Sequence, residues 1–444
     1  MKMDSLLRVG FGCADITPEK YSSLAGFGND AYRICDNILD RPMATCIAIS
    51  DENDQTVLLF TADTLYTHEK QAEMARASIT DATGIPGERI LIAATHTHAG
   101  PSVFAAAKTV QEYYPHYVKQ LTKAALEALG DRKEAQVFAG QKTVKNMTFV
   151  RHYLMNDGSY AGAGFGSFKS GVKAHADVAD EQMQLIRFKR EGASDIVLVN
   201  WQSHATITSA STRTDMSSDY VGTMRNHLEG LSGCKVAFFQ GACGNLVPSS
   251  RISEEMIVEH DHILYGRKLA EFAFEGLMDL RPVKTGEIRS LQMIYRAAVD
   301  HSDDPLVPAA KTVWENYYKI EDLKERAKLV QENGFNSVHH AMQTLNRANA
   351  GDAIDMELNV LCAGDISFAT APYEMFCSNG KYIKENTPFE ITFVVGYCNG
   401  FNSYIPDKNA FGYDCYEVNA RRFPVGAAED IAETHVKLLK ELKG

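Results

Sequence analysis

Histidine and acidic residues follow three of the apolar runs in this chain, at positions where their side chains could hold a metal ion. The segment Thr95-His96-Thr97-His98 follows one run, His204 follows another and Glu374 follows a third. Two imidazoles and a carboxylate suit zinc, which leaves one position for water when its site is catalytic. Because residues two apart in an extended segment face the same way, His96 and His98 can reach one cavity. We expect one of them to be a ligand and the other to transfer a proton or to support the site.

The elements that must position these residues form a pattern that occurs three times. Each copy reads strand, turn, strand, helix, strand, with apolar or alternating strands and glycine or aspartate at the turns. The strands are expected at 43–49, 56–62 and 89–94, at 183–188, 195–201 and 235–240, and at 356–362, 365–371 and 391–396. The helices are expected at 70–82, 218–231 and 375–385. The sequence therefore predicts an α/β fold with mixed β-sheets flanked by helices, built from repeated strand-strand-helix-strand units.

Polar residues fall at the same two places in every copy. The second strand ends at Asp63, His204 or Glu374, and the third strand ends at 95–98, 241–245 or 399–404. Since ligands of α/β sheets bind beyond the carboxyl ends of the strands, six loops can form one pocket. We expect Asp63 and Asn245 to bind substrate there. The alternative is that short α/β units look alike by chance and that His204 is a hydrogen-bonded core residue.

Composition excludes several classes of partner. The chain has 444 residues, 45% of them hydrophobic, and a formal net charge of -12, which argues against the clustered basic face that nucleic acids require. No apolar run approaches the roughly 18 to 20 residues that cross a membrane. Segment 1–12 lacks the apolar region of a secretion signal, and the nine cysteines show no paired spacing. We expect a globular, cytoplasmic protein without a nucleic-acid partner or an integral membrane segment.

Several short motifs occur in a fixed order along the chain. They are GFGCADITP at 10–18, THTHAGP at 95–101, NWQSH at 200–204, SDYVG at 218–222, FQGACGN at 239–245, PYE at 372–374 and NGFNSY at 399–404. Together they resemble the neutral ceramidase family, specifically its amino-terminal catalytic domain. The resemblance extends from about Val9 to Glu417.

The resemblance implies a zinc-dependent hydrolase that cleaves the amide bond of a small N-acyl or lipid-like substrate with a metal-activated water, as in sphingolipid metabolism. The single zinc ion would be held by His96, His204, Glu374 and Tyr404. The scissile carbonyl and its oxyanion would be contacted by His98, Arg151 and Tyr416. A zinc-dependent esterase or phosphoesterase, or a binding protein without activity, remains the alternative.

Two departures from the family pattern concern the substrate. Val247 stands where the ceramidases have a serine, so the hydroxyl that could bind the polar head of a sphingoid is absent. A polar head placed against Val247 would be left unpaired at a cost of roughly 1 to 3 kcal/mol. The chain also ends at Gly444, without room for the carboxyl-terminal immunoglobulin-like domain of longer ceramidases. We expect residues 1–444 to form a single catalytic domain that prefers substrates smaller than long-chain ceramide.

Three further segments need an interpretation. Segment 302–350 reads as charged amphipathic helices inserted before the third copy, either as a lid or as a dimer surface for a homo-oligomer. The glycine-rich segment 162–166 lacks the preceding strand of a phosphate loop and is expected to be a flexible loop. His260 and His262 lie on an expected helix at 254–280, where residues two apart do not share a face, so we do not expect them to bind metal.

Overall fold

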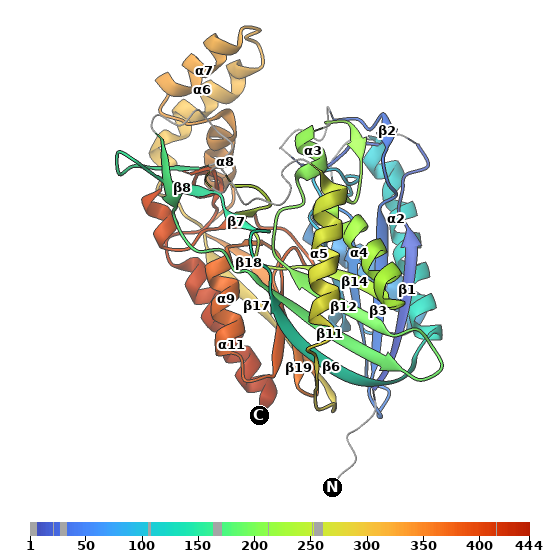
Figure 1. Ribbon diagram of the computed structural model, residues 1–444. Coiled ribbons are helices and arrows are strands. Elements are labelled where there is room, and N and C mark those ends of the chain that lie inside the picture. Colours follow the sequence, from blue (N-terminus) through green and yellow to red (C-terminus); the bar gives the residue numbers. More distant parts are fainter. Residues whose placement is uncertain are drawn as a thin grey trace.

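The architecture is an α/β arrangement of sheets with helices along their outer sides (Figure 1). A computed structural model describes residues 7–20, 22–26, 33–104, 108–162, 171–211, 213–250, 252, 261–413 and 415–444. The helices α6 and α7 project from one end of the molecule, and the carboxyl terminus lies at the opposite end. The mixed sheets and flanking helices confirm the predicted fold class.

Three four-stranded units with the same topology form most of the β-structure. In each unit the first two pairings are antiparallel and the last is parallel. The units are β1 (Leu7–Asp15), β3 (Met43–Ser50), β4 (Thr56–Ala62) and β5 (Ile90–Ala94), then β6 (Lys133–Thr143), β11 (Gln182–Arg190), β12 (Ile196–Trp201) and β14 (Lys235–Gln240), then β17 (Ile288–Ala298), β18 (Ala353–Ala363), β19 (Ile366–Thr370) and β21 (Ile391–Val395). The predicted threefold repetition is confirmed, and each copy gains a leading strand that was not predicted.

The first two units share one sheet and the third forms another. In the shared sheet the order is β14-β12-β11-β6-β1-β3-β4-β5, and the short β16 (Arg281–Pro282) pairs with β6. The third unit has the order β17-β18-β19-β21. The last strands of all three units end close together, because Gly396 N donates to Gln240 O at 3.1 Å and Ala94 N donates to Tyr397 O at 3.2 Å.

Two helices cover the outer face of each unit. These pairs are α1 (Glu69–Thr83) with α2 (Lys108–Gly130), α4 (Asp219–Ser232) with α5 (His262–Gly276), and α9 (Cys377–Asn386) with α11 (Ala427–Lys443). In Figure 1, α4 and α5 lie over the green strands of the second unit, and α9 and α11 lie along the third. The predicted helices 70–82, 218–231 and 375–385 are α1, α4 and α9, with ends shifted by at most two residues.

Burial on both faces explains why strands such as β4 are almost continuously apolar. In β4, Val57 and Leu59 enter the core where the three units meet, whereas Leu58 and Phe60 pack with α1 and α2. Phe368 of the third unit lies in the same inner core. Removing side chains of this size from water contributes about 1.5 to 3 kcal/mol each. The three units are therefore held together by one shared core.

The insertion is helical, as predicted, and it lies between β17 and β18, within the third unit. It comprises η2 (Asp304–Leu306), α6 (Val307–Tyr317), α7 (Leu323–Glu332) and α8 (Val338–Ala348). Its helices enclose a small core of their own, formed by Ala310, Val313, Val330, Phe335 and Ala341. In Figure 1, α6 and α7 project outward, whereas α8 lies below them and contacts α10 (Tyr416–Ala420).

Short elements complete the loops. They are β2 (Asn37–Ile38), η1 (Gly87–Arg89), β7 (Phe149–Val150), β8 (His152–Met155), β9 (Tyr160–Gly162), β10 (Val172–His175), α3 (Ile207–Ser211), β13 (Asp215–Met216), β15 (Leu246–Val247), β20 (Glu374–Met375), β22 (Tyr404–Ile405) and η3 (Asn409–Gly412). No described helix has the length and apolar character needed to cross a membrane.

Two predicted segments differ from the structure or lie partly outside it. The helix expected at 254–280 is described only as α5, whose first residue is His262. It ends at Gly276 instead of Leu280, and Arg281 and Pro282 already pair with β6 as the strand β16. His260 and residues 163–166 of the expected loop lie outside the described residues. Gly162 is the last residue of β9, so the expectation that no strand precedes this segment was wrong.

Candidate metal centre

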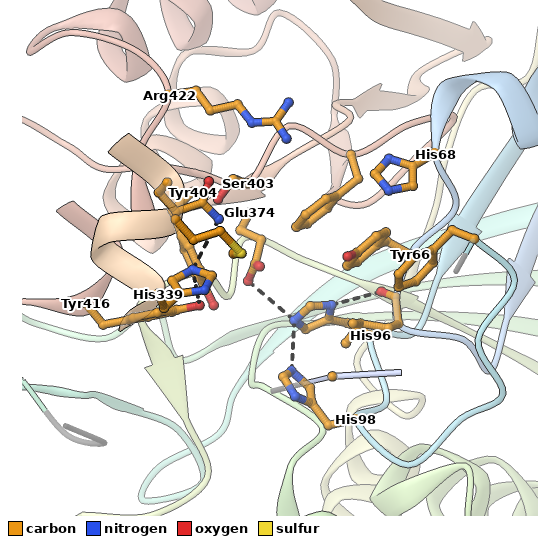
Figure 2. Close-up of a pocket in the computed structure, with 16 residues that line it drawn as sticks. Tyr66, His68, His96, His98, His339, Glu374, Ser403, Tyr404, Tyr416 and Arg422 are labelled. Atoms are coloured by element: carbon orange, nitrogen blue, oxygen red, sulfur yellow. Dashed lines mark hydrogen bonds and ion pairs between the residues drawn. The ribbon is translucent and has the colours of Figure 1, made fainter. Parts of the chain in front are cut away.

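A pocket of about 390 Å³ opens among the loops at the carboxyl ends of the strands. His96, His98 and Glu374 lie together in it (Figure 2). The insertion contributes His339 and Met342 of α8 to the wall. The insertion therefore forms part of the pocket wall, and its role as a lid or as a dimer surface stays a prediction.

Two histidines in the pocket are oriented by backbone carbonyls. His96 Nδ1 lies 2.9 Å from Leu65 O, and His204 Nδ1 lies 2.8 Å from Cys243 O. A neutral imidazole that donates from Nδ1 has its lone pair on Nε2. Both Nε2 atoms lie 3.4 Å from Glu374 Oε2. The two lone pairs therefore face the same carboxylate oxygen.

This arrangement fits a metal cation. His204 is 1% exposed, and its Nε2 has no hydrogen-bond partner among the described residues. Burial lowers the pKa of His204 to about 4, so its imidazole is neutral at pH 7. Acceptors that face each other at this distance need a proton or a cation between them, and two imidazoles with a carboxylate suit zinc.

The three side chains come from three different units. His96 follows β5, His204 follows β12 and Glu374 follows β19, as the repeat predicted. Thr97 forms a bridge with Ala205, and Gly244 N donates to Met375 O at 2.7 Å.

Gly244 is required for close contact between the second and third units. A Cβ atom at Gly244 would lie 2.7 Å from Glu374 O, so a larger residue would push the two loops apart. The absence of a side chain at this position keeps the Glu374 loop against the second unit.

Tyr404 lies beside Glu374 because the short strands β20 and β22 pair in parallel, with Glu374 opposite Tyr404. Its side chain lines the pocket and is 5% exposed. Burial and the Glu374 charge raise the pKa of the Tyr404 phenol well above its usual value, whereas the Arg151 guanidinium, 5.4 Å above the ring, lowers it. The phenol is thus placed next to the predicted ligand set.

His98 lies near enough to be a third imidazole at the centre. Its Nε2 is 3.3 Å from His96 Nε2, and ligand atoms of His96, His98 and His204 all lie within 4.8 Å of one another. Burial and the two neighbouring histidines lower the pKa of His98 well below its usual value. Gly26, with φ of +115°, makes room for this ring, since a Cβ there would lie 2.8 Å from His98 Nδ1.

Left-handed backbone conformations gather at the centre. His96, Tyr397 and Ser403 have φ of 62°, 56° and 62°, a region that costs an L-residue roughly 1 to 2 kcal/mol. His96 and Tyr397 each stand two residues beyond the last strand of their unit, and their rings stack with centroids 3.9 Å apart. The Tyr397 hydroxyl donates to Glu374 Oε2 at 3.3 Å. Tyr397 therefore supports both predicted ligands.

Arg151 is held behind Tyr404 by a buried carboxylate. Its Nε donates to Glu417 Oε1, and its Nη2 donates to Gly244 O at 2.9 Å. Burial would lower the pKa of the guanidinium, but Glu417 and Tyr404 raise it well above the usual value. Arg151 therefore carries a fixed positive charge next to the Tyr404 ring.

A second group that could hold a metal consists of His152, Cys415 and Glu417. Glu417 Oε2 lies 2.8 Å from His152 Nε2, and its other oxygen accepts from Arg151. Burial and the Glu417 charge raise the pKa of the Cys415 thiol, which therefore stays protonated. The guanidinium already neutralises this carboxylate, so the first group suits a cation better.

Three residues expected to bind substrate lie around the pocket and do not line it. Asp63 is 0% exposed and accepts two hydrogen bonds from Arg225, one of 2.9 Å. Asn245 Oδ1 accepts from the backbone N–H of Cys377 at 2.9 Å. Val247 is half-buried in β15, opposite Phe149. Their contact with substrate stays a prediction.

The structure was compared with known proteins. Comparisons with protein-family models and with curated proteins gave no match. A neutral ceramidase from Pseudomonas aeruginosa superimposes with a TM-score of 0.73 at 16% identity, covering 99% of this chain and 75% of that one. A ceramidase complexed with C2 gives a TM-score of 0.72 at 16% identity, covering 99% and 76%. The chain has a neutral-ceramidase-like fold.

Within the ceramidase-like fold, some pocket residues were not found from the sequence. Tyr397 occupies the repeat position of His96, which was an available signal. Arg422 and the aromatic residues Tyr66 and Phe104 line the pocket, but no spacing pattern links them. Tyr416, which was predicted, lines the pocket with its hydroxyl 3.2 Å from His339 Nε2.

Proposed function

We propose that this protein is a zinc-dependent hydrolase that cleaves the amide bond of an N-acyl substrate. The observation that carries the proposal is the pair of imidazole lone pairs that face Glu374 Oε2 at 3.4 Å in an open pocket. Zinc held there would polarise a carbonyl and lower the pKa of water to near 7. The ceramidase-like fold supports an amide as the bond that is cleaved.

Two donors beside the candidate centre would act on the reacting carbonyl. His98 and Tyr416 lie on different sides of the pocket (Figure 2). Burial raises the pKa of the Tyr416 phenol, so its hydroxyl keeps the proton that it can donate to negative charge on the former carbonyl oxygen. His98, which stands next to His96 and has a lowered pKa, would first accept a proton and then pass it to the leaving amine.

Arg151 would contribute through its charge. Its guanidinium is anchored by Glu417 and faces the Tyr404 ring. A fixed positive charge near the centre favours any group that becomes negative during the reaction.

The size of the pocket favours a small substrate. A volume of about 390 Å³ equals roughly 13 water molecules at ~30 Å³ each. A short acyl amide fits in this space, whereas most of a long-chain ceramide would extend outside it. We therefore propose that short N-acyl amides are hydrolysed faster than ceramide.

The proposal is tested by metal analysis together with a substrate panel. We expect about one zinc per chain, hydrolysis of short N-acyl amides, loss of this activity with a chelator and its return with zinc. Matched esters in the panel distinguish an amidase from an esterase. A zinc-loaded protein that cleaves the esters but none of the amides would contradict the proposal.

Replacing His98 by alanine is expected to leave zinc bound but to lower kcat by about 100-fold. Removing one donor to charge that develops in the transition state typically has an effect of this size. Zinc content and kcat are measured side by side, with His96→Ala as the matched variant that should lose both. If the two variants lose zinc equally, His98 is a ligand as well.

A further inference from the structure

Arg422 places a positive charge in the pocket wall without a carboxylate partner among the described residues. Its guanidinium makes one long hydrogen bond within the described part of the chain, 3.5 Å from Nη1 to Asn402 Oδ1. No carboxylate oxygen of a described residue lies within 4.0 Å of it. In Figure 2, Arg422 extends toward the pocket from the side opposite His98, with Glu374 and His96 between them in this view.

Several other arginines in the interior form ion pairs with carboxylates. The pairs are Arg76 with Glu357, Arg151 with Glu417, Arg225 with Asp63, Arg347 with Asp303 and Arg421 with Asp300. At Arg151 and Arg225 the carboxylate partners raise the pKa of the guanidinium. At Arg422 burial lowers the pKa, and Glu69 and Tyr66 offset only part of that effect. The charge of Arg422 is therefore incompletely balanced by the protein.

The nearby carboxylate of Glu69 is occupied elsewhere. Its Oε1 accepts from the backbone N–H of Phe401 at 3.1 Å and from Asn402 Nδ2 at 2.9 Å. These bonds hold Glu69 against the loop after β21. Glu69 therefore acts on Arg422 only through its charge, and no carboxylate of the described residues forms an ion pair with the guanidinium.

The wall near Arg422 is aromatic. Tyr66 stacks between Phe401 and Phe104, with ring centroids 3.5 Å and 4.2 Å apart. All three rings line the pocket together with Arg422 and the candidate metal centre. The pocket thus combines a bond-cleaving centre, apolar faces for an acyl chain and one cationic group.

We propose that Arg422 binds a carboxylate on the substrate, so that the preferred substrates are N-acyl amides with a free carboxylate, such as N-acylated amino acids. The planar guanidinium matches a carboxylate through two parallel hydrogen bonds. A single cation suits a monoanion, and a chain with a net charge of -12 provides no field that attracts polyanions. The inference rests on the proposed amidase function for the bond that is cleaved.

The first test measures binding with probes that cannot be hydrolysed. Zinc-loaded protein is titrated calorimetrically with 4-oxoundecanoate and with 1-hydroxyundecan-4-one, which has a hydroxymethyl group in place of the carboxylate. We expect the carboxylate to bind roughly 10- to 100-fold more tightly in the unmodified protein. Arg422→Gln should bring this ratio close to one, and Arg422→Lys should give an intermediate ratio. Arg296→Gln, which removes an exposed arginine, should leave the ratio unchanged.

The second test measures hydrolysis of N-octanoylglycine and N-octanoylethanolamine, with homologues one methylene longer between amide and polar end. A carboxylate preference in kcat/KM that Arg422→Gln removes is the expected result. Carboxylate-selective binding that depends on Arg422, without hydrolysis of either compound, would support this inference and overturn the proposed function. Equal binding and hydrolysis of charged and neutral compounds at both lengths, or a preference that persists in Arg422→Gln, would overturn the inference while leaving the amidase proposal intact.

Discussion

Replacing His204 by alanine is expected to abolish zinc binding and, with it, amide hydrolysis. The Nε2 of His204 has no hydrogen-bond partner among the described residues and lies 3.4 Å from Glu374 Oε2, as expected of a direct ligand. Loss of an outer hydrogen-bond partner already weakens a zinc site 10- to 100-fold, and loss of a direct ligand should cost at least about 100-fold. Zinc per chain after gel filtration, measured by elemental analysis, should fall from about one to near zero.

A matched control separates loss of the ligand from general damage to the pocket. His339→Ala removes another histidine from the pocket wall, far along the chain on α8, and should keep its zinc. Near-ultraviolet circular dichroism checks that both variants are folded. Full zinc in folded His204→Ala would show that the ligand assignment is wrong.

Replacing Asp63 by alanine is expected to lower the free energy of unfolding by about 3 to 5 kcal/mol. Asp63 is 0% exposed and accepts two hydrogen bonds from Arg225, which is 5% exposed, so the change leaves a buried guanidinium without its partner. Uncompensated buried charges have costs of this size. Urea unfolding followed by circular dichroism measures the difference.

Two companion variants make this result specific. Asp63→Ala combined with Arg225→Met removes both charges and should recover much of the loss. Asp15→Ala breaks the exposed ion pair with Arg41 and should cost less than about 1 kcal/mol. If Asp63→Ala is as stable as the unmodified protein but binds substrate poorly, Asp63 serves the substrate, as its position at a strand end first indicated.

The repeated units were predictable because their signals are local. Strands such as β4, β12 and β19 are buried on both faces, so their apolar runs and turns mark the elements directly in the sequence. The repeat also placed His96, His204 and Glu374 at strand ends that the structure brings together. Local patterns were thus sufficient for the fold class and for the centre of the candidate site.

The surroundings of the site depend on contacts between distant segments. Asp63 follows β4 in the first unit, as Glu374 follows β19 in the third. Asp63 nevertheless pairs with Arg225 of the second unit, and no sequence spacing indicates this contact. The reach of α8 into the pocket and the exposure of Arg422 to it also follow from how the insertion and the last loops pack. Such pairings are properties of the assembled molecule, so a single sequence does not reveal them.

The origin of the candidate ligands in three separate units has a consequence for how the molecule matures. Each unit alone supplies only one of His96, His204 and Glu374, so a chain with one unit undocked has no complete cradle for zinc. A bound ion would act as a tether across the junction, and its binding free energy would add to the cohesion of the docked state. Zinc would therefore bind tightly only to chains in which all three units have docked.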